Sequence, residues 1–153
     1  MLNTGLRAEE VCSLVTSNLE ISERKGEVLV QRGKGRKQRR IPLNKQARQA
    51  LSAWLEIRLE TEASWIFTGQ RGDAFSTSAL RRIISALAYS ARLDPDEVSP
   101  HSLRHTFAKR LVDQEVSLEK VAALLGHSNL NTTRICLTPG QGDLEKAVEV
   151  LEY

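Results

Sequence analysis

The stretch NLEISERKGEVLVQRGKGRKQRRIPL, residues 18–43, decides the fold class because the hydrophobic period of the chain changes there. Hydrophobic residues occupy every second position in segments 19–21 and 28–30, as they do along a half-buried β-strand. Glycines in segments 24–26 and 33–35 mark turns, and the proline before the final leucine is expected to end the last extended segment. The stretch therefore predicts a three-stranded antiparallel meander.

Amphipathic helices are predicted on both sides of this meander, because hydrophobic residues recur there with i, i+3, i+4 spacing. Asn44, Ser76 and Ser117 are residue types that commonly cap helix N-termini. Residues 65–75 are expected to contain a short buried strand and a glycine-rich loop. The predicted helices cover residues 7–15, 44–60, 76–91, 101–114, 117–125, 132–136 and 142–151. The predicted fold class is α+β, mainly α, with one small sheet packed on a helical core.

The composition is that of an ordinary globular chain, with 41% hydrophobic and 27% charged residues over a length of 153. This length, without an internal repeat or linker, predicts a single domain over residues 1–153. No apolar run can span a bilayer and no signal-peptide pattern opens the chain, so no membrane partner is expected. Cys12 and Cys136 lack metal-ligand spacing, and we interpret them as reduced thiols in a cytoplasmic protein without a metal site.

Positive charge is concentrated in one segment, RGKGRKQRR, residues 32–40. The segment carries six cations and no acid, whereas the whole chain carries a net charge of +3, so the remainder carries −3. A solvated hairpin tip would explain this charge, but such a cluster also suits a polyanion such as nucleic acid. The candidate DNA-binding residues are Arg32, Arg36, Lys37, Arg39 and Arg40.

Four short motifs carry polar residues suited to phosphate chemistry. They are TGLRAEEV with Arg7, GKGRK with Lys34, HSLRH with His101 and Arg104, and LLGHSNLNTTRIC with His127 and Cys136. Each has a plainer structural interpretation: Arg7 could pair with Glu10, and His127 could cap a helix C-terminus. His101 and Arg104 could be surface residues. Together, however, two arginines, one lysine and two histidines suit the binding and proton transfer that a phosphate transition state needs.

The four motifs, in this order and spacing, resemble those of the tyrosine recombinases of the phage integrase family, and the resemblance covers nearly the whole chain. It implies the DNA breaking-rejoining catalytic fold. It also implies that a tyrosine cleaves one strand of double-stranded DNA, forming a 3′-phosphotyrosyl bond and a free 5′-hydroxyl, without a metal or nucleotide cofactor. Such a protein would act in site-specific recombination or integration, in the cytoplasm of a bacterium or from a phage, associated with the nucleoid.

The resemblance also implies a role for each matched residue. Arg7 and Arg104 would clamp the scissile phosphate. Lys34 would act as general acid toward the leaving 5′-oxygen. His101 and His127 would support proton transfer and phosphate binding.

The residue at the nucleophile position departs from the family, because the tyrosine belongs nine residues after His127 and this sequence has Cys136 there. A thiolate could substitute, but its sulfur lies under about 3 Å from its Cα whereas a tyrosine oxygen lies roughly 6.5 Å away. Tyr89 or Tyr153 could supply a hydroxyl instead, although Tyr89 is expected at a helix core or edge and the spacing of Tyr153 fits nothing in the family. We favour a lost nucleophile, with DNA binding kept and cleavage absent or weak.

The resemblance also leads to expectations about the two ends of the sequence. The chain begins three residues before TGLR, so the family's upstream helical DNA-binding domain and the start of the first catalytic-domain helix would be missing. The segment 142–151 resembles the family's tail helix, which could pack on a second protomer or fold back on its own core. The alternatives to an impaired recombinase are a cleavage-defective DNA-binding or oligomerising module and an α-rich domain without a DNA role.

Overall fold

The computed structural model describes residues 1–31, 38–58, 64–69, 72–127, 131–133 and 137. Several predictions fall on residues outside this part of the chain. They concern Arg32, Lys34, Arg36, Lys37, Cys136, Tyr153, most of the predicted helix 132–136 and the whole of the predicted helix 142–151.

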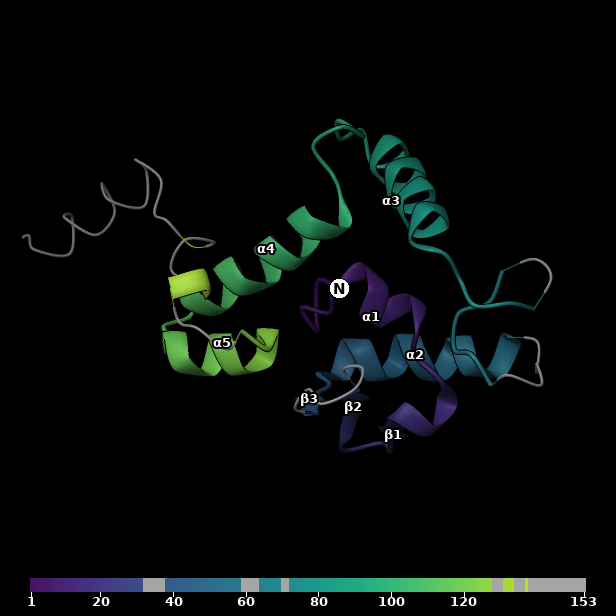
Figure 1. Ribbon diagram of the computed structural model, residues 1–153, viewed down its shortest axis with the longest axis horizontal. Coiled ribbons are helices and arrows are strands. Elements are labelled where there is room, and N and C mark those ends of the chain that lie inside the picture. Colours follow the sequence, from purple (N-terminus) through teal and green to yellow (C-terminus); the bar gives the residue numbers. More distant parts are fainter. Residues whose placement is uncertain (32–37, 59–63, 70–71, 128–130, 134–136, 138–153) are drawn as a thin grey trace, which may run out of the picture.

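A three-stranded antiparallel sheet forms where the alternating pattern predicted it (Figure 1). Its strands are β1 (Leu19–Ile21), β2 (Gly26–Val30) and β3 (Arg39–Pro42), in the order β1-β2-β3. Val28 pairs with Leu19 on one side and with Ile41 on the other. Val28 and Ile41 are each 1% exposed, so one face of the sheet packs into the hydrophobic core.

Helices lie before and after this sheet in the described part of the chain. They are α1 (Ala8–Cys12), α2 (Lys45–Ile57), α3 (Thr77–Ser90), α4 (Pro100–Val112) and α5 (Leu118–Leu125), with a 3₁₀ helix η1 (Thr16–Asn18). Asn44 and Ser76 accept hydrogen bonds from the backbone N–H three residues on, at 2.8 and 3.1 Å, which confirms two predicted N-caps. Helix α4 begins slightly earlier than predicted, because Ser99 caps it and Pro100 needs no hydrogen-bond acceptor at the first helical position.

In the described residues 65–69 and 72–75, the predicted strand does not form. The segment makes isolated antiparallel bridges instead, Val15 with Trp65 and Thr68 with Ala74. The loop thus pairs with the chain that follows α1 and with itself rather than joining the sheet. Helix α1 ends at Cys12, so it is shorter than the predicted helix over residues 7–15.

Two hydrophobic clusters form the core, and Leu124 packs against both of them. One surrounds the sheet and the other lies between α4 and α5. Gly5 adopts a φ of +61°, and a Cβ placed there would lie 2.5 Å from Phe107 and 2.9 Å from Leu125. Only glycine therefore lets the chain before α1 approach α4 and α5 this closely, and this contact brings the start of α1 to the end of α5.

An apolar groove of about 610 Å³ runs beside α2 and α3. It is lined in part by Leu2, Trp54, Ile83 and Leu87, whose side chains remain exposed. The apolar stripe of α3 is therefore only partly covered. Among the residues that the structure describes, no helix combines the length and the apolar character needed to cross a membrane.

Candidate functional site

Four of the predicted catalytic residues line one cavity of about 420 Å³. Arg7 comes from the start of α1, His101 and Arg104 from α4, and His127 from the residue pair that follows α5. These residues are up to 120 positions apart in the sequence, and the tertiary structure brings them together. Lys34 and Cys136 lie outside the described residues, so their places in the site stay predictions.

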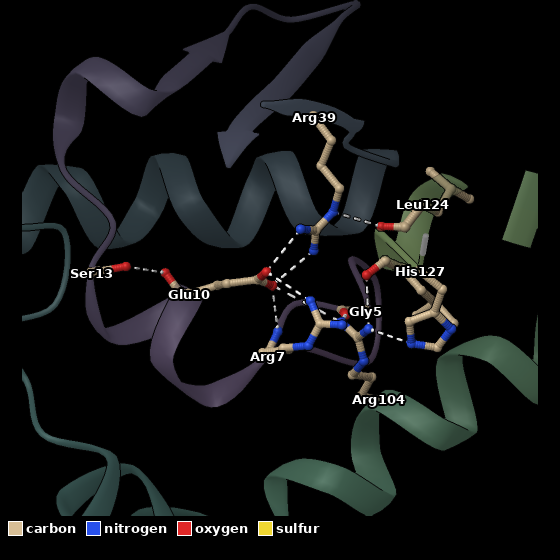
Figure 2. A network of polar contacts seen from close by, with 9 residues as sticks. Gly5, Arg7, Glu10, Ser13, Arg39, Arg104, Leu124 and His127 are labelled. Carbon is tan, nitrogen blue, oxygen red and sulfur yellow. Dashed lines mark hydrogen bonds and ion pairs between the residues drawn. The ribbon is translucent and has the colours of Figure 1, made fainter. Parts of the chain in front are cut away.

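The carboxylate of Glu10 lies at the centre of the polar network beside this cavity (Figure 2). Glu10 Oε1 and Oε2 each accept a hydrogen bond of 2.8 Å from Arg39. The carboxylate also accepts the backbone N–H of Arg7 at 2.8 Å, as the acidic member of a capping box does, and Arg7 Nη1 at 3.2 Å. Burial alone would raise the pKa of Glu10, but the hydrogen bonds and charges of Arg39 and Arg7 outweigh it and lower that pKa.

Arg104 is buried, and its guanidinium contacts the chain before α1, helix α1 itself and the end of α5 with the residues that follow it. Its Nη1 donates to the carbonyl oxygen of Gly5, and its Nη2 donates to the carbonyl oxygen of Leu125 at 2.8 Å. The same Nη2 lies 3.1 Å from Nε2 of His127, and Nη1 lies 4.0 Å from Oε2 of Glu10. These contacts fix the orientation of the planar guanidinium where it lines the cavity.

The contacts of His127 define its tautomer. Because a guanidinium can only donate, Nε2 of His127 must accept from Arg104 and carries no proton. Nδ1 therefore carries the proton and donates to Oγ1 of Thr133, 2.9 Å away. Burial and then the positive charges of Arg104, Arg7 and Arg39 lower the pKa of His127 to about 4, so the ring is neutral near neutral pH.

The end of α5 delivers His127 to this place through a glycine. Gly126 adopts a φ of +67°, and the backbone N–H groups of Gly126 and His127 donate to the carbonyl oxygens of Ala123 and Ala122, as in a Schellman motif. A Cβ at Gly126 would lie 2.9 Å from Nη1 of Arg39. The turn thus needs glycine both for its backbone conformation and for the approach of Arg39. The prediction that His127 follows a helix C-terminus is confirmed.

Arg39 and Arg40 were both predicted to face DNA, and the structure gives them different surroundings. The side chain of Arg39 is only 11% exposed, since it reaches inward to Glu10 and donates from Nε to the carbonyl oxygen of Leu124 at 3.0 Å. Arg40 is 58% exposed and forms an ion pair with Glu27 on the sheet. Whether either residue contacts DNA stays a prediction, but the guanidinium of Arg39 is already committed to partners within the protein.

The sequence held a signal for the inward direction of Arg39. Side chains alternate along a strand, so residue 39 lies on the same face as Ile41, which is a core residue. The sequence indicates Glu10 only as a possible partner of Arg7, and it does not indicate the contact between Thr133 and His127. No pattern in the sequence identifies the second of these pairs, because it depends on how the short helical turn 131–133 packs.

The described residues contain no group of three or more histidine, cysteine, aspartate or glutamate side chains that could hold a metal ion. Glu9 is an acid in the lining of the cavity, but arginine and histidine side chains outnumber it there, which suits an anion. Two arginine guanidiniums and a neutral imidazole present nitrogen atoms to a space large enough for a phosphate group.

Comparison with known sequences gives one consistent result. The sequence profile described as the phage integrase family matches residues 1–138. The tyrosine recombinase XerC of Corynebacterium glutamicum is 38% identical over 134 residues, covering 86% of this chain and 42% of that protein. The XerC of Bacillus pumilus is 36% identical over 151 residues, covering 94% of this chain and 48% of that protein. The chain thus spans about half the length of the curated relatives it matches.

Solved structures show the same fold. The crystal structure of XerA recombinase superimposes with a TM-score of 0.87 at 28% identity, covering 99% of this chain and 56% of that one. The site-specific recombinase XerH, in a pre-cleavage complex with its difH substrate, gives a TM-score of 0.79 at 28% identity, covering 99% of this chain and 44% of that one. The predicted catalytic fold, mainly helical with a small antiparallel sheet, is therefore confirmed.

Proposed function

Because the chain belongs to the phage integrase family of tyrosine recombinases, we propose that it is a catalytic domain for site-specific recombination or integration of double-stranded DNA. We take residues 1–153 as this one domain. The relatives that match it are bacterial proteins, and we place the chain with DNA in the cytoplasm, at the nucleoid. The single observation that carries the proposal is the convergence of Arg7, Arg104 and His127 on one cavity.

The cavity binds one DNA phosphate in this proposal. Arg7 is partly exposed at its edge, and Arg104 is buried with its orientation fixed by backbone carbonyls. Guanidiniums bind phosphate oxygens in bidentate geometry, and an arginine that is already oriented loses little side-chain entropy on binding. His101 lies one helical turn before Arg104 and lines the same cavity. Lys34 completes the set as general acid toward the 5′-oxygen.

His127 acts as an acceptor rather than as an acid in this site. Its Nδ1 donates to Thr133, and its Nε2 accepts from Nη2 of Arg104. A neutral ring whose pKa is lowered to about 4 does not carry a second proton to donate near neutral pH. His127 therefore holds Arg104, and the acidic role falls to Lys34 and His101.

Strand cleavage is impaired because Cys136 stands where the family has tyrosine. The thiol would stop about 3–4 Å short of the position that a tyrosine oxygen reaches, and a misplacement of ~1 Å already lowers rates about 10²-fold. DNA binding does not require the nucleophile, so the alternative function is that of a cleavage-defective DNA-binding or oligomerising module. In that case the apolar stripe Leu144, Val148 and Leu151 packs on a second protomer.

A suicide DNA substrate tests the proposal. We expect the chain to form little or no covalent adduct in a denaturing gel, and Cys136→Tyr to restore the adduct. Duplex binding that weakens log-linearly with salt is expected for both proteins. DNA binding that does not depend on salt, or that is unchanged in Arg104→Met, would contradict the proposal that the cavity binds a DNA phosphate. Gel filtration with light scattering, before and after truncation at residue 140, tests the oligomer.

A further inference from the structure

Arg39 joins three elements that meet beside the cavity. It is the first residue of β3, its two terminal nitrogens bind Glu10 of α1, and its Nε binds the Leu124 carbonyl near the end of α5. In Figure 2, Arg39 reaches the Glu10 carboxylate from above, whereas Arg104 lies below it. Each of the three nitrogens of this guanidinium donates a hydrogen bond within the protein, at 2.8–3.0 Å.

The contact between Arg39 and Glu10 affects the cavity because Glu10 is a buried, charged neighbour of the cavity arginines. Glu10 is 9% exposed and lies within 4.0 Å of both cavity arginines, Arg7 and Arg104. A buried carboxylate must be neutralised by close partners. If Arg39 did not supply that partner, Glu10 would draw on the same two guanidiniums that are needed for an anion, and its negative charge would repel that anion.

The shape of the site depends on Arg39 as well. Its side chain lies so close to Gly126 that a Cβ there would be 3.0 Å from Cδ and 2.9 Å from Nη1. The next residue is His127, which lines the cavity. The guanidinium therefore fixes the distance between α1, with Arg7 and Glu10, and the C-terminus of α5.

We propose that Arg39 is a positioning residue of the phosphate site, which holds the Glu10 carboxylate and the end of α5 in place for the residues that line the cavity. This inference rests on the proposed function, because the anion in question is the DNA phosphate. It replaces the expectation that Arg39 contacts DNA directly. A lysine would not replace it, since one ammonium group cannot span both Glu10 oxygens and the Leu124 carbonyl with planar geometry.

The experiment compares the affinity of the chain for a DNA duplex across a charge-matched set of variants, by fluorescence anisotropy over a range of salt. Arg39→Met removes the guanidinium and keeps much of the apolar stem. Arg39→Met combined with Glu10→Gln removes both buried charges. Arg39→Met combined with Glu56→Gln has the same net charge, but removes an exposed acid on α2 that does not line the cavity. Arg48→Met controls for loss of a structural arginine that binds backbone carbonyls elsewhere.

A positioning role predicts that Arg39→Met weakens binding about tenfold and that Glu10→Gln restores most of it, since contacting residues couple by amounts of this order. The Glu56→Gln combination should stay weak, and Arg48→Met should bind as the parent does. The slope of affinity against salt should not change with Arg39→Met, whereas loss of a direct phosphate contact lowers it by about 0.9. Arg39→Lys should remain weak although its charge is kept.

Two outcomes separate the failure of this inference from the failure of the proposed function. If the parent binds DNA and Arg104→Met weakens it, but Arg39→Met does not, only the positioning role is overturned. The same holds if Glu10→Gln fails to rescue, or if the slope falls by about one unit, which would make Arg39 a DNA contact. If the parent itself shows no salt-dependent duplex binding, both the proposed function and this role are overturned.

Discussion

Nη2 of Arg104 lies 3.1 Å from Nε2 of His127, and the same nitrogen donates to the carbonyl oxygen of Leu125. The guanidinium can only donate, so this contact makes the imidazole an acceptor and excludes the doubly protonated ring while it persists. The relationship couples the two side chains: any change that protonates His127 also breaks a contact that orients Arg104. The protonation state of the ring and the shape of the cavity are therefore linked.

The linkage predicts a dependence of stability on pH. The pKa of His127 is lowered to about 4 in the folded chain, whereas an unfolded histidine titrates near 6.5. The unfolded state therefore binds the proton first, so the free energy of unfolding is unaffected above about pH 6.5 and falls as the pH drops from there toward 4. Urea denaturation at several pH values measures this.

His127→Gln provides the comparison, because an amide does not titrate and its oxygen can still accept from Arg104. We expect this variant to be less dependent on pH between about 6.5 and 5 than the parent. Glu10, whose pKa is also lowered, contributes only at lower pH, below its ordinary value of 4.5. Identical pH curves for the two proteins between 6.5 and 5 would contradict the assigned state of the ring.

Replacement of Arg104 by lysine should weaken duplex binding by about tenfold or more, as expected when a buried charge-assisted contact is lost. One ammonium group cannot serve Gly5, Leu125 and a phosphate together. Anisotropy titrations at fixed salt measure the effect. Arg110→Lys, an exposed position on the same helix, is the matched control and should bind like the parent.

Thr133 should determine which nitrogen of His127 carries the proton. Thr133 is fully buried and its hydroxyl lies 2.9 Å from Nδ1. Thr133→Val keeps the shape but leaves the Nδ1–H donor without its acceptor, and should lower the free energy of unfolding by about 1–2 kcal/mol. Two-bond ¹⁵N–¹H spectra of the imidazole should report a loss of the pure Nδ1–H tautomer.

Thr133→Ser keeps the hydroxyl and should retain the tautomer of the parent. Thr106→Val is the control for a threonine that bonds a backbone carbonyl on the exposed side of α4. It should leave the imidazole spectrum unchanged. An unaltered spectrum in Thr133→Val would show that Arg104 alone fixes the ring.

Gly5→Ala should be strongly destabilising, because two effects add at this position. The residue needs a φ of +61°, and its new Cβ would lie 2.5 Å from the ring of Phe107. We expect a loss of about 2–5 kcal/mol in the free energy of unfolding, measured by chemical denaturation. A loss below about 1 kcal/mol would mean that the chain before α1 does not pack against α4 as closely as described.

Much of the fold could be predicted from the sequence because its signals are local. Alternation in residues 19–30 specifies strands, and Asn44 and Ser76 satisfy the free N–H groups of the helices that follow them. The bridges of Val15 and Thr68 were missed because they depend on which loop lies beside which chain. A single isolated pair leaves no periodic pattern in the sequence.

The sequence alone determined the small sheet, the main helices and the set of cationic and imidazole side chains, since each follows from short-range periodicity or from a motif. The tertiary structure alone decided which partners those side chains have. It placed Arg39 as a buried partner of Glu10, and it made His127 a neutral acceptor. The physical reason is that a charged group takes its state from its nearest partners and its burial, and elements far apart in the chain supply both.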